Sequence, residues 1–276
     1  MMTEIDADAF DDWEAAGWEG RAEAYHRYFS SLTSRLGGPL LDLAAVGPGC
    51  RVLDVATGPG YVAAAAAERG SVVTGVDVAE AMVLLATRLN PGVEFLQADA
   101  QELPYPAGTF DAVVGNLAIL HFGRPEKAVA EFTRVLAPGG RLALSTWDKP
   151  AIGRLPGIFF EAIQEAGAQP PPDLPPGPPF FRFADENEFA GLLRAAGLSD
   201  VSVETVAFSH RFPGVEEVWR WLLDGTVRAG VMVTSQPEDM QTRIYDNLVR
   251  LATPYRNGVD GALDIPVSVR IAHGRR

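Results

Sequence analysis

Short apolar segments alternate with helix-like segments between Arg51 and Trp147. Each apolar segment is rich in Val, Leu and Ala, which is typical of a strand that is buried on both faces. The predicted strands are residues 51–56, 72–77, 93–97, 110–116 and 141–147, and the predicted helices between them are residues 61–69, 79–89 and 126–136. Strands that are separated by single helices imply right-handed crossovers, so this region predicts a parallel sheet of the α/β class.

The flanking regions have a different pattern. Residues 1–45 predict an N-terminal helical lid with two helices, and residues 46–276 predict the α/β domain. Within that domain, residues 168–179 are Pro-rich and predict a semi-rigid loop. The remaining predicted elements are a helix at 186–196, strands at 201–208 and 265–273, and two helices at 216–228 and 238–251, which form a cap at about 211–262.

Composition and charge narrow the classes of partner. The chain has 276 residues, with 23 basic and 36 acidic side chains and a formal net charge of −13. An acidic chain is repelled by phosphate, so we expect neither nucleic acid nor an anionic membrane as a partner. A single cysteine, Cys50, excludes an intramolecular disulfide and a multi-cysteine metal site. Without an apolar signal core or a membrane-length apolar run, the expected location is the cytoplasm.

The first candidate for chemistry is the turn that follows the first predicted strand. That strand carries Asp54 near its end, and Gly58 and Gly60 follow, where a side chain would prevent backbone from approaching a ligand. Asp77 stands at the end of the second strand, 17 residues beyond Gly60, where a carboxylate suits a ribose diol. The carboxyl ends of parallel strands meet at one sheet edge, so these residues predict a nucleoside-type site.

The glycine pattern alone leaves two cofactor classes open. Residues 58–63 also satisfy the G-x-G-x-x-A pattern of dinucleotide sites. Asp54 argues against a dinucleotide, because a carboxylate inside the strand suits the ammonium group of an amino-acid ligand and is poorly placed near a pyrophosphate. Asp99, after the third strand, supplies a further acidic side chain that can accept a hydrogen bond from an adenine amino group.

Five segments in a fixed order then resemble a known family. They are Val52-Leu53-Asp54-Val55-Ala56-Thr57-Gly58-Pro59-Gly60, Gly75-Val76-Asp77-Val78-Ala79-Glu80-Ala81-Met82, Phe95-Leu96-Gln97-Ala98-Asp99-Ala100-Gln101-Glu102-Leu103-Pro104, Phe110-Asp111-Ala112-Val113-Val114-Gly115-Asn116 and Arg134-Val135-Leu136-Ala137-Pro138-Gly139-Gly140-Arg141-Leu142. Over residues 50–147 the chain resembles a class I S-adenosylmethionine-dependent methyltransferase, of the branch typified by the C-methyltransferases of ubiquinone and menaquinone biosynthesis.

The resemblance implies a fold and a set of cofactor residues. The implied fold is a Rossmann-like seven-stranded sheet in the order 3-2-1-4-5-7-6, with the last strand antiparallel and helices on both faces. The implied cofactor is S-adenosylmethionine, with S-adenosylhomocysteine as product. Its implied contacts are Asp54, Ala56, Gly58 and Gly60 for the methionine moiety, Asp77 for the ribose, Val78 and Met82 for the adenine ring, Asp99 and Ala100 for the adenine edge, and Asn116 for the methyl-donor end.

The acceptor side is supported by fewer residues. His121 follows the fourth strand and is the candidate general base, although a methyl transfer needs a base only if the nucleophile must lose a proton. Candidate acceptor contacts are Trp18, Tyr25, Trp147 and His210, and His26 is a weaker candidate near the expected mouth of the site. A loop histidine that only packs, or an aromatic residue that only fills the core, remains the alternative for each.

Some classes of methyl acceptor are disfavoured because the sequence lacks the motifs that they require. The fourth strand lacks an Asn/Asp-Pro-Pro-Tyr/Phe motif, which argues against methylation of nucleobase amino groups, and no Pro-Cys nucleophile or clustered metal ligands are present. We therefore expect methyl transfer to carbon or oxygen of a small, apolar or aromatic metabolite. A cofactor-binding relative that catalyses a non-methylating cyclisation or elimination is the main alternative, followed by a regulatory protein with a vestigial site and a nicotinamide dehydrogenase. Homodimer formation stays open.

Overall fold

The protein is built around a seven-stranded mixed sheet. The computed structural model describes residues 5–257 and 261–276. The strand order is β3-β2-β1-β4-β5-β7-β6, and β7 runs antiparallel to both of its neighbours, whereas the other described pairs are parallel. This confirms the predicted sheet order. The strands are β1 (Arg51–Val55), β2 (Val72–Asp77), β3 (Glu94–Gln97), β4 (Phe110–Gly115), β5 (Leu136–Trp147), β6 (Ser199–Phe212) and β7 (Leu263–Arg275).

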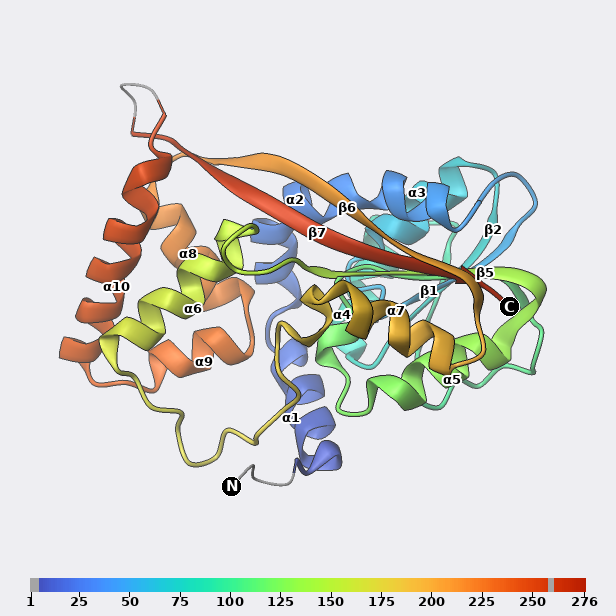
Figure 1. Ribbon diagram of the computed structural model, residues 1–276, viewed down its shortest axis with the longest axis horizontal. Helices are drawn as coiled ribbons and strands as arrows, with labels where there is room; N and C mark the ends of the chain where they lie inside the picture. Colours follow the sequence, from blue (N-terminus) through green and yellow to red (C-terminus); the bar gives the residue numbers. More distant parts are fainter. Residues whose placement is uncertain (1–4, 258–260) are drawn as a thin grey trace.

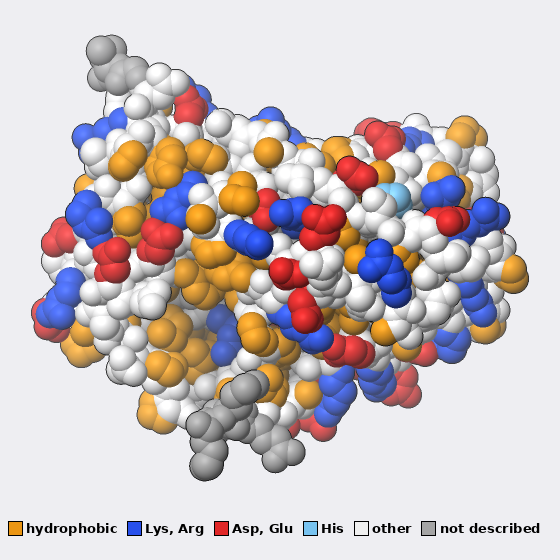
Figure 2. Space-filling view, viewed as in Figure 1, with side chains coloured by type: hydrophobic (Ala, Val, Ile, Leu, Met, Phe, Trp, Pro, Cys, Tyr) orange, Lys and Arg blue, Asp and Glu red, His pale blue; other side chains and the backbone are white. Residues whose placement is uncertain are grey.

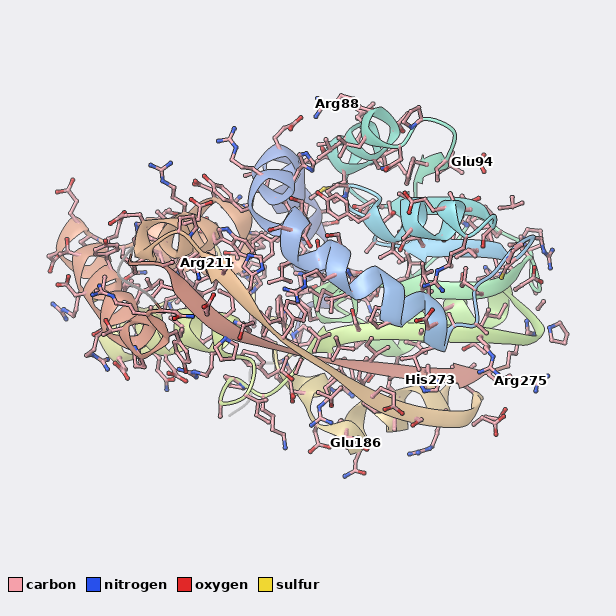
Figure 3. All side chains as sticks on the ribbon, turned by 90° about the horizontal axis from the view of Figure 1, so that it is seen from above. Arg88, Glu94, Glu186, Arg211, His273 and Arg275 are labelled. Carbon is pink, nitrogen blue, oxygen red and sulfur yellow. The ribbon has the colours of Figure 1, made fainter. Side chains whose placement is uncertain are left out.

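Helices cover both faces of the sheet. Successive side chains of each strand point to opposite sides, so apolar strands present an apolar surface on each face that helices bury. In β1, Val52 belongs to one buried apolar cluster and Leu53 to the other. The first cluster is covered by α2 (Ala22–Leu43), α3 (Tyr61–Glu68) and α6 (Arg154–Ala166), and the second by α5 (Pro125–Val135) and α7 (Glu186–Ala195). Figure 3 shows α2 lying along one face of the sheet. The predicted two-sided burial of the strands is therefore confirmed.

The strands β6 and β7 form a ribbon that is longer than predicted. They pair from Ser199 opposite Arg275 to Phe212 opposite Leu263, whereas β5 pairs with β7 only from Val269 to Arg275. The ribbon thus continues beyond the sheet, from Arg275 at one end to Arg211 at the other (Figure 3). Its far end carries the helical insertion, which comprises α8 (Val215–Gly225), α9 (Arg228–Thr234) and α10 (Glu238–Ala252).

The two predicted helices at 216–228 and 238–251 correspond to α8 and α10, but α8 ends at Gly225 and the prediction missed α9, which follows it. Thr226 adopts an extended conformation, with φ −120° and ψ 145°. Its hydroxyl donates to the carbonyl of Leu222 and accepts from the amide of Gly230, so it joins α8 to α9. A Cβ at Gly225 would lie 2.6 Å from the ring of Phe29, so the close approach to α2 requires glycine at the end of α8.

Two other segments differ from the sequence prediction. Helix α6 lies in residues 148–167, for which no element was predicted. Strand β5 begins at Leu136 instead of Arg141, and residues 138–140 form an irregularity within it, where the register with β4 shifts and Gly139 has φ +82°.

The two N-terminal helices contact a third helix beside the sheet. They are α1 (Ala7–Glu19) and α2, and α4 (Glu80–Leu89) packs against both. The Pro-rich segment passes beside α1 on its way from α6 to α7 (Figure 1). Within the described residues, no helix combines the length and the apolarity that crossing a bilayer requires.

Candidate functional site

The glycine turn between β1 and α3 is shaped by three residues with positive φ. Ala56, Gly58 and Gly60 have φ of +49°, +53° and +81°, which is the left-handed region. A Cβ at Gly60 would lie 2.7 Å from the side-chain nitrogen of Asn90 and 2.8 Å from the ring of Phe95. The turn therefore needs glycine at position 60 for both its backbone conformation and its packing.

Asp54 is a buried carboxylate at the end of β1, with 1% of its surface exposed. Its Oδ2 accepts hydrogen bonds from the Thr57 hydroxyl at 2.6 Å and from the amide of Ala63 at 3.0 Å. Burial raises the pKa of Asp54 to about 7, against the lowering effect of these hydrogen bonds. A carboxylate that is held this far from water favours a positively charged partner.

Asp77 is a second buried carboxylate, at the end of β2. Its Oδ2 accepts from the amide of Gly58 at 2.9 Å and its Oδ1 from the amide of Ala79 at 3.0 Å. Burial raises the pKa of Asp77 to about 6. The parallel register places Asp54 opposite Gly75, so the ends of β1 and β2 bring the two carboxylates to the same turn.

These residues fit the methionine and ribose parts of S-adenosylmethionine. Within the described residues, Oδ1 of Asp54 accepts no hydrogen bond, so it is available to an ammonium group. Each Asp77 oxygen has one hydrogen bond and retains a lone pair for a ribose hydroxyl. A cation near both carboxylates would also offset the desolvation that raises their pKa values.

The residues expected at the adenine lie around α4 and the end of β3. Val78 is 43% exposed, whereas Met82 is buried in a small apolar cluster that Trp18 and Tyr25 also contact. Asp99 is exposed and accepts a hydrogen bond from the amide of Gln101, and Ala100 is buried. These four residues follow the ends of β2 and β3, which are neighbouring parallel strands.

Asn116 is held by a hydrogen-bond network at the end of β4. Its amide nitrogen donates to the carbonyl of Thr33 in α2, and its oxygen accepts from the hydroxyl of Ser145. The same hydroxyl accepts from the amide of Leu117, which has φ +54°. Ser145 was missed by sequence analysis; the available signal was a polar residue within the apolar strand β5.

His121 is paired with a residue that the sequence did not single out. Its Nδ1 lies 2.9 Å from Oε2 of Glu14, which is 3% exposed and belongs to α1. The His121 ring also meets Trp18 edge to face, with 5.2 Å between ring centroids. Because a carboxylate accepts and does not donate, this contact favours the tautomer with the proton on Nδ1, which leaves the lone pair on Nε2.

The structure brings together two of the four candidate acceptor contacts. Trp18 meets Tyr25 edge to face at 5.3 Å. A Cβ at Gly58 would lie 4.0 Å from Tyr25, so Tyr25 borders the glycine turn and Trp18 packs against Tyr25. Burial raises the pKa of the Tyr25 hydroxyl, which keeps that group neutral. Trp147 is buried in the apolar cluster on the α2 side of the sheet.

His210 is separated from the turn, whereas His26 contacts the residue that directly follows it. His210 is buried against Phe212 and Trp221, and Trp221 in turn contacts Phe29, which stacks on Tyr25. Two aromatic rings therefore separate His210 from Tyr25. Burial lowers the pKa of His210, which favours its neutral form. His26 lies 2.6 Å from the hydroxyl of Tyr61, at the start of α3.

Comparison with known proteins identifies the region that contains this site. Residues 53–144 match the protein family described as "Methyltransferase domain". Demethylmenaquinone methyltransferase of Thermus thermophilus is 40% identical over 132 residues, which are 45% of this chain and 60% of that protein. The corresponding enzyme of Renibacterium salmoninarum is 33% identical over 127 residues, which are 46% of this chain and 54% of that protein. The chain thus spans little more than half the length of these curated relatives.

Solved structures share the fold. YcgJ from Bacillus subtilis superposes with a TM-score of 0.57 at 20% identity, over 88% of this chain and 98% of YcgJ. The [4+2]-cyclase SpnF superposes with a TM-score of 0.51 at 20% identity, over 88% of this chain and 80% of SpnF. The resemblance to class I methyltransferases of the ubiquinone and menaquinone branch is confirmed for the matched region.

Proposed function

We propose that this chain, whose residues 53–144 form a methyltransferase domain, transfers a methyl group from S-adenosylmethionine to a small molecule. The observation that carries the proposal is the pair of buried carboxylates, Asp54 and Asp77, on one left-handed glycine turn. Asp54 would hold the ammonium group of the cofactor and Asp77 the ribose hydroxyls. Val78, Met82, Asp99 and Ala100 would surround the adenine, and Asn116 would border the methyl-donor end.

The chain would contribute positioning and proton transfer. The bound cofactor supplies a methyl group on a positively charged sulfur, which a nucleophile attacks in line. Trp18 and Tyr25 would exclude water and orient the acceptor, because proximity and orientation are the main needs of such a displacement. His121 would accept a proton at Nε2 while Glu14 stabilises the charge that forms on the imidazole ring.

The surroundings of the site support an apolar or aromatic acceptor. Aromatic rings extend from Trp18 and Tyr25 through Phe29 to Trp221. Figure 2 shows hydrophobic side chains gathered over the region where α6 and α9 lie. We propose that α1 and α2 act as a lid, that the helical insertion acts as a cap, and that Trp147 and His210 wall the acceptor pocket from behind the first layer of rings.

Calorimetric titration with S-adenosylhomocysteine tests the cofactor site. We expect binding by the unmodified protein and at least a tenfold loss of affinity in Asp77→Ala, because both ribose contacts are removed. Asp111→Ala is the matched control, because Asp111 is ion-paired to Arg51 near the opposite ends of the strands. Failure of the unmodified protein to bind either S-adenosylmethionine or S-adenosylhomocysteine contradicts the proposal.

A non-methylating cyclisation is the second candidate, because the fold is shared with the cyclase SpnF. The two activities differ in their products. Release of S-adenosylhomocysteine during turnover supports methyl transfer, whereas turnover of the acceptor with the cofactor unchanged supports the cyclase.

The proposal also covers the cellular setting. We propose a cytoplasmic enzyme that acts on a free small molecule and not on nucleic acid. The net charge of −13 supports the exclusion of nucleic acid, because an acidic protein is repelled by phosphate backbones. The number of chains in the active assembly is a question for sedimentation analysis, with a homodimer as one candidate.

A further inference from the structure

Glu14 has an unpartnered oxygen inside the protein. Its side chain is 3% exposed, and although Oε2 contacts His121, Oε1 is buried without a hydrogen bond. An unsatisfied buried acceptor destabilises the fold, because it has lost its hydrogen bonds to water without gaining a partner. Such an atom is uncommon in a native fold, and a ligand that supplies the missing donor accounts for it.

Arg228 has an unpartnered donor in the same region. Its Nη2 donates to the carbonyl of Pro175, but Nη1 is buried without a partner. The guanidinium carbon lies 5.1 Å from the ring centroid of Phe10 and 5.2 Å from that of Trp13. Arg228 therefore combines a hydrogen-bond donor, a positive charge and an aromatic surround.

The two side chains are near each other but are not ion-paired. Burial lowers the pKa of Arg228, and the charge of Glu14 counteracts this effect. Among the ion pairs of the described residues, none joins Glu14 to Arg228 within 4.0 Å. Because the two side chains are held apart, Glu14 keeps an unpaired acceptor and Arg228 keeps an unpaired donor. A ligand that carries one hydrogen-bond donor and one acceptor would be complementary to this pair.

Close packing of three segments fixes this arrangement. A Cβ at Gly17 of α1 would lie 2.2 Å from Val227, directly before Arg228, and a Cβ at Gly177 of the Pro-rich segment would lie 2.2 Å from Phe10. Arg21 adds a hydrogen bond from its Nε to the carbonyl of Thr226. Glycine at both positions lets α1, α9 and the Pro-rich segment approach one another closely, so the positions of Glu14 and Arg228 are set by the fold.

We propose that Glu14 and Arg228 recognise the methyl acceptor, and that this acceptor is an aromatic molecule with a hydroxyl beside a carboxylate or carbonyl oxygen. The inference rests on the proposed function and names its substrate class. Glu14 Oε1 would accept from the hydroxyl, Arg228 Nη1 would donate to the neighbouring oxygen, and Phe10, Trp13 and Trp18 would contact the ring.

The location relative to the cofactor site agrees with this role. His121 contacts Glu14 directly. Burial raises the pKa of Asp77, and His121 is close enough to counteract part of that rise. Trp18 contacts both His121 and Tyr25, and Tyr25 borders the glycine turn. A hydroxyl of the acceptor that is bound to Glu14 would therefore lie beside His121, the candidate base.

Three naphthalene probes test the proposal on the full chain saturated with S-adenosylhomocysteine. 1-Hydroxy-2-naphthoate carries both groups, 2-naphthoate lacks the hydroxyl, and 1-naphthol lacks the carboxylate. We expect the first probe to bind at least tenfold more tightly than either of the others. Glu14→Leu removes the acceptor and should bring the affinity ratio of the first probe to 2-naphthoate close to one. Arg228→Met removes the donor and should bring the affinity ratio of the first probe to 1-naphthol close to one.

The crossed pattern separates recognition from general damage. A variant that merely unfolds loses S-adenosylhomocysteine as well, whereas both variants should keep the affinity of the unmodified protein for that ligand. Equal or absent binding of the three probes by the unmodified protein overturns the inference, as do preferences that neither substitution changes. Loss of S-adenosylhomocysteine binding by the unmodified protein would instead contradict the proposed function.

Discussion

At the scale of single residues, Asp54 is the proposed partner of the cofactor's ammonium group, and its burial lowers the stability of the unliganded protein. Both of its protein hydrogen bonds end on Oδ2, and burial raises its pKa from 3.8 to about 7. Because the folded-state pKa lies above the unfolded-state value, the folded protein binds the extra proton between pH 4 and 7. The unliganded protein therefore loses stability as the pH rises through this window.

Asp54→Asn should stabilise the unliganded protein while weakening cofactor binding. The amide oxygen can keep both hydrogen bonds, and the buried charge disappears. We expect the free energy of unfolding at pH 8 to rise by about 1–3 kcal/mol, and the gain to vanish toward pH 4, where Asp54 is protonated in the folded protein. Urea denaturation at several pH values measures this difference. A gain that is constant from pH 4 to 8 would show that the charge of Asp54 is not its cause.

The residue scale also shows what a linear pattern cannot reveal. Asp54, Gly58, Gly60 and Asp77 were found from the sequence because each stands at a fixed offset from a strand end. Glu14 and Ser145 were not found, because their partners His121 and Asn116 lie 107 and 29 residues away. Their roles depend on contacts that only folding creates.

At the scale of elements, α1 is attached to α4 by a side-chain cap. The carboxylate of Glu19 accepts from the amides of Glu80 at 2.5 Å and Ala81 at 3.0 Å. The residue at the N-cap position of α4 is Ala79, which provides no side-chain hydrogen bond. Glu19 therefore supplies from another helix the acceptor that a capping side chain would normally provide.

Glu19→Ala should loosen both helices. The lost cap costs about 0.5–2 kcal/mol, and we expect faster hydrogen exchange in the first turn of α4 and in α1. The matched control is Glu23→Ala, which removes an ion pair to Arg88 whose side chains are 66% and 61% exposed. Exposed pairs contribute about 0–1 kcal/mol, so exchange in α4 should change less in the control. Equal exchange rates in the two variants would argue against the cap.

At the scale of the whole molecule, α2 packs against α8 of the helical insertion, which is about 190 residues away in the sequence. The rings of Phe29 in α2 and Trp221 in α8 lie 4.4 Å apart between centroids, and Tyr28 donates to Asp224. Trp221 is 2% exposed and also contacts His210 and Phe212 at the end of β6. Apolar packing thus joins the N-terminal helices to the helical insertion.

Trp221→Ala should destabilise the whole protein and weaken the cofactor site. Deleting a buried Trp side chain costs about 3–5 kcal/mol, which corresponds to a decrease in Tm of roughly 6–20 °C for a chain of this size. Affinity for S-adenosylhomocysteine should also fall, because Phe29 supports Tyr25. Trp219→Ala on the same helix is the control, since Trp219 is only partly buried and packs on Tyr245. Thermal unfolding and calorimetric titration measure both effects, and equal losses in the two variants would contradict the argument.

The sequence by itself determined the α/β class, the glycine turn and the acidic residues at the strand ends. These features depend on local spacing and on backbone conformations that glycine alone adopts at low cost, so they can be identified without knowing the fold. The motif resemblance added the sheet order. Tertiary structure decided how Thr226 divides the helical insertion, where the extra helix α6 lies, and which residues surround His121 and Asn116. Those features arise from contacts between α1, α2 and α8–α9, about 200 residues apart, and such contacts leave no periodic pattern in the chain.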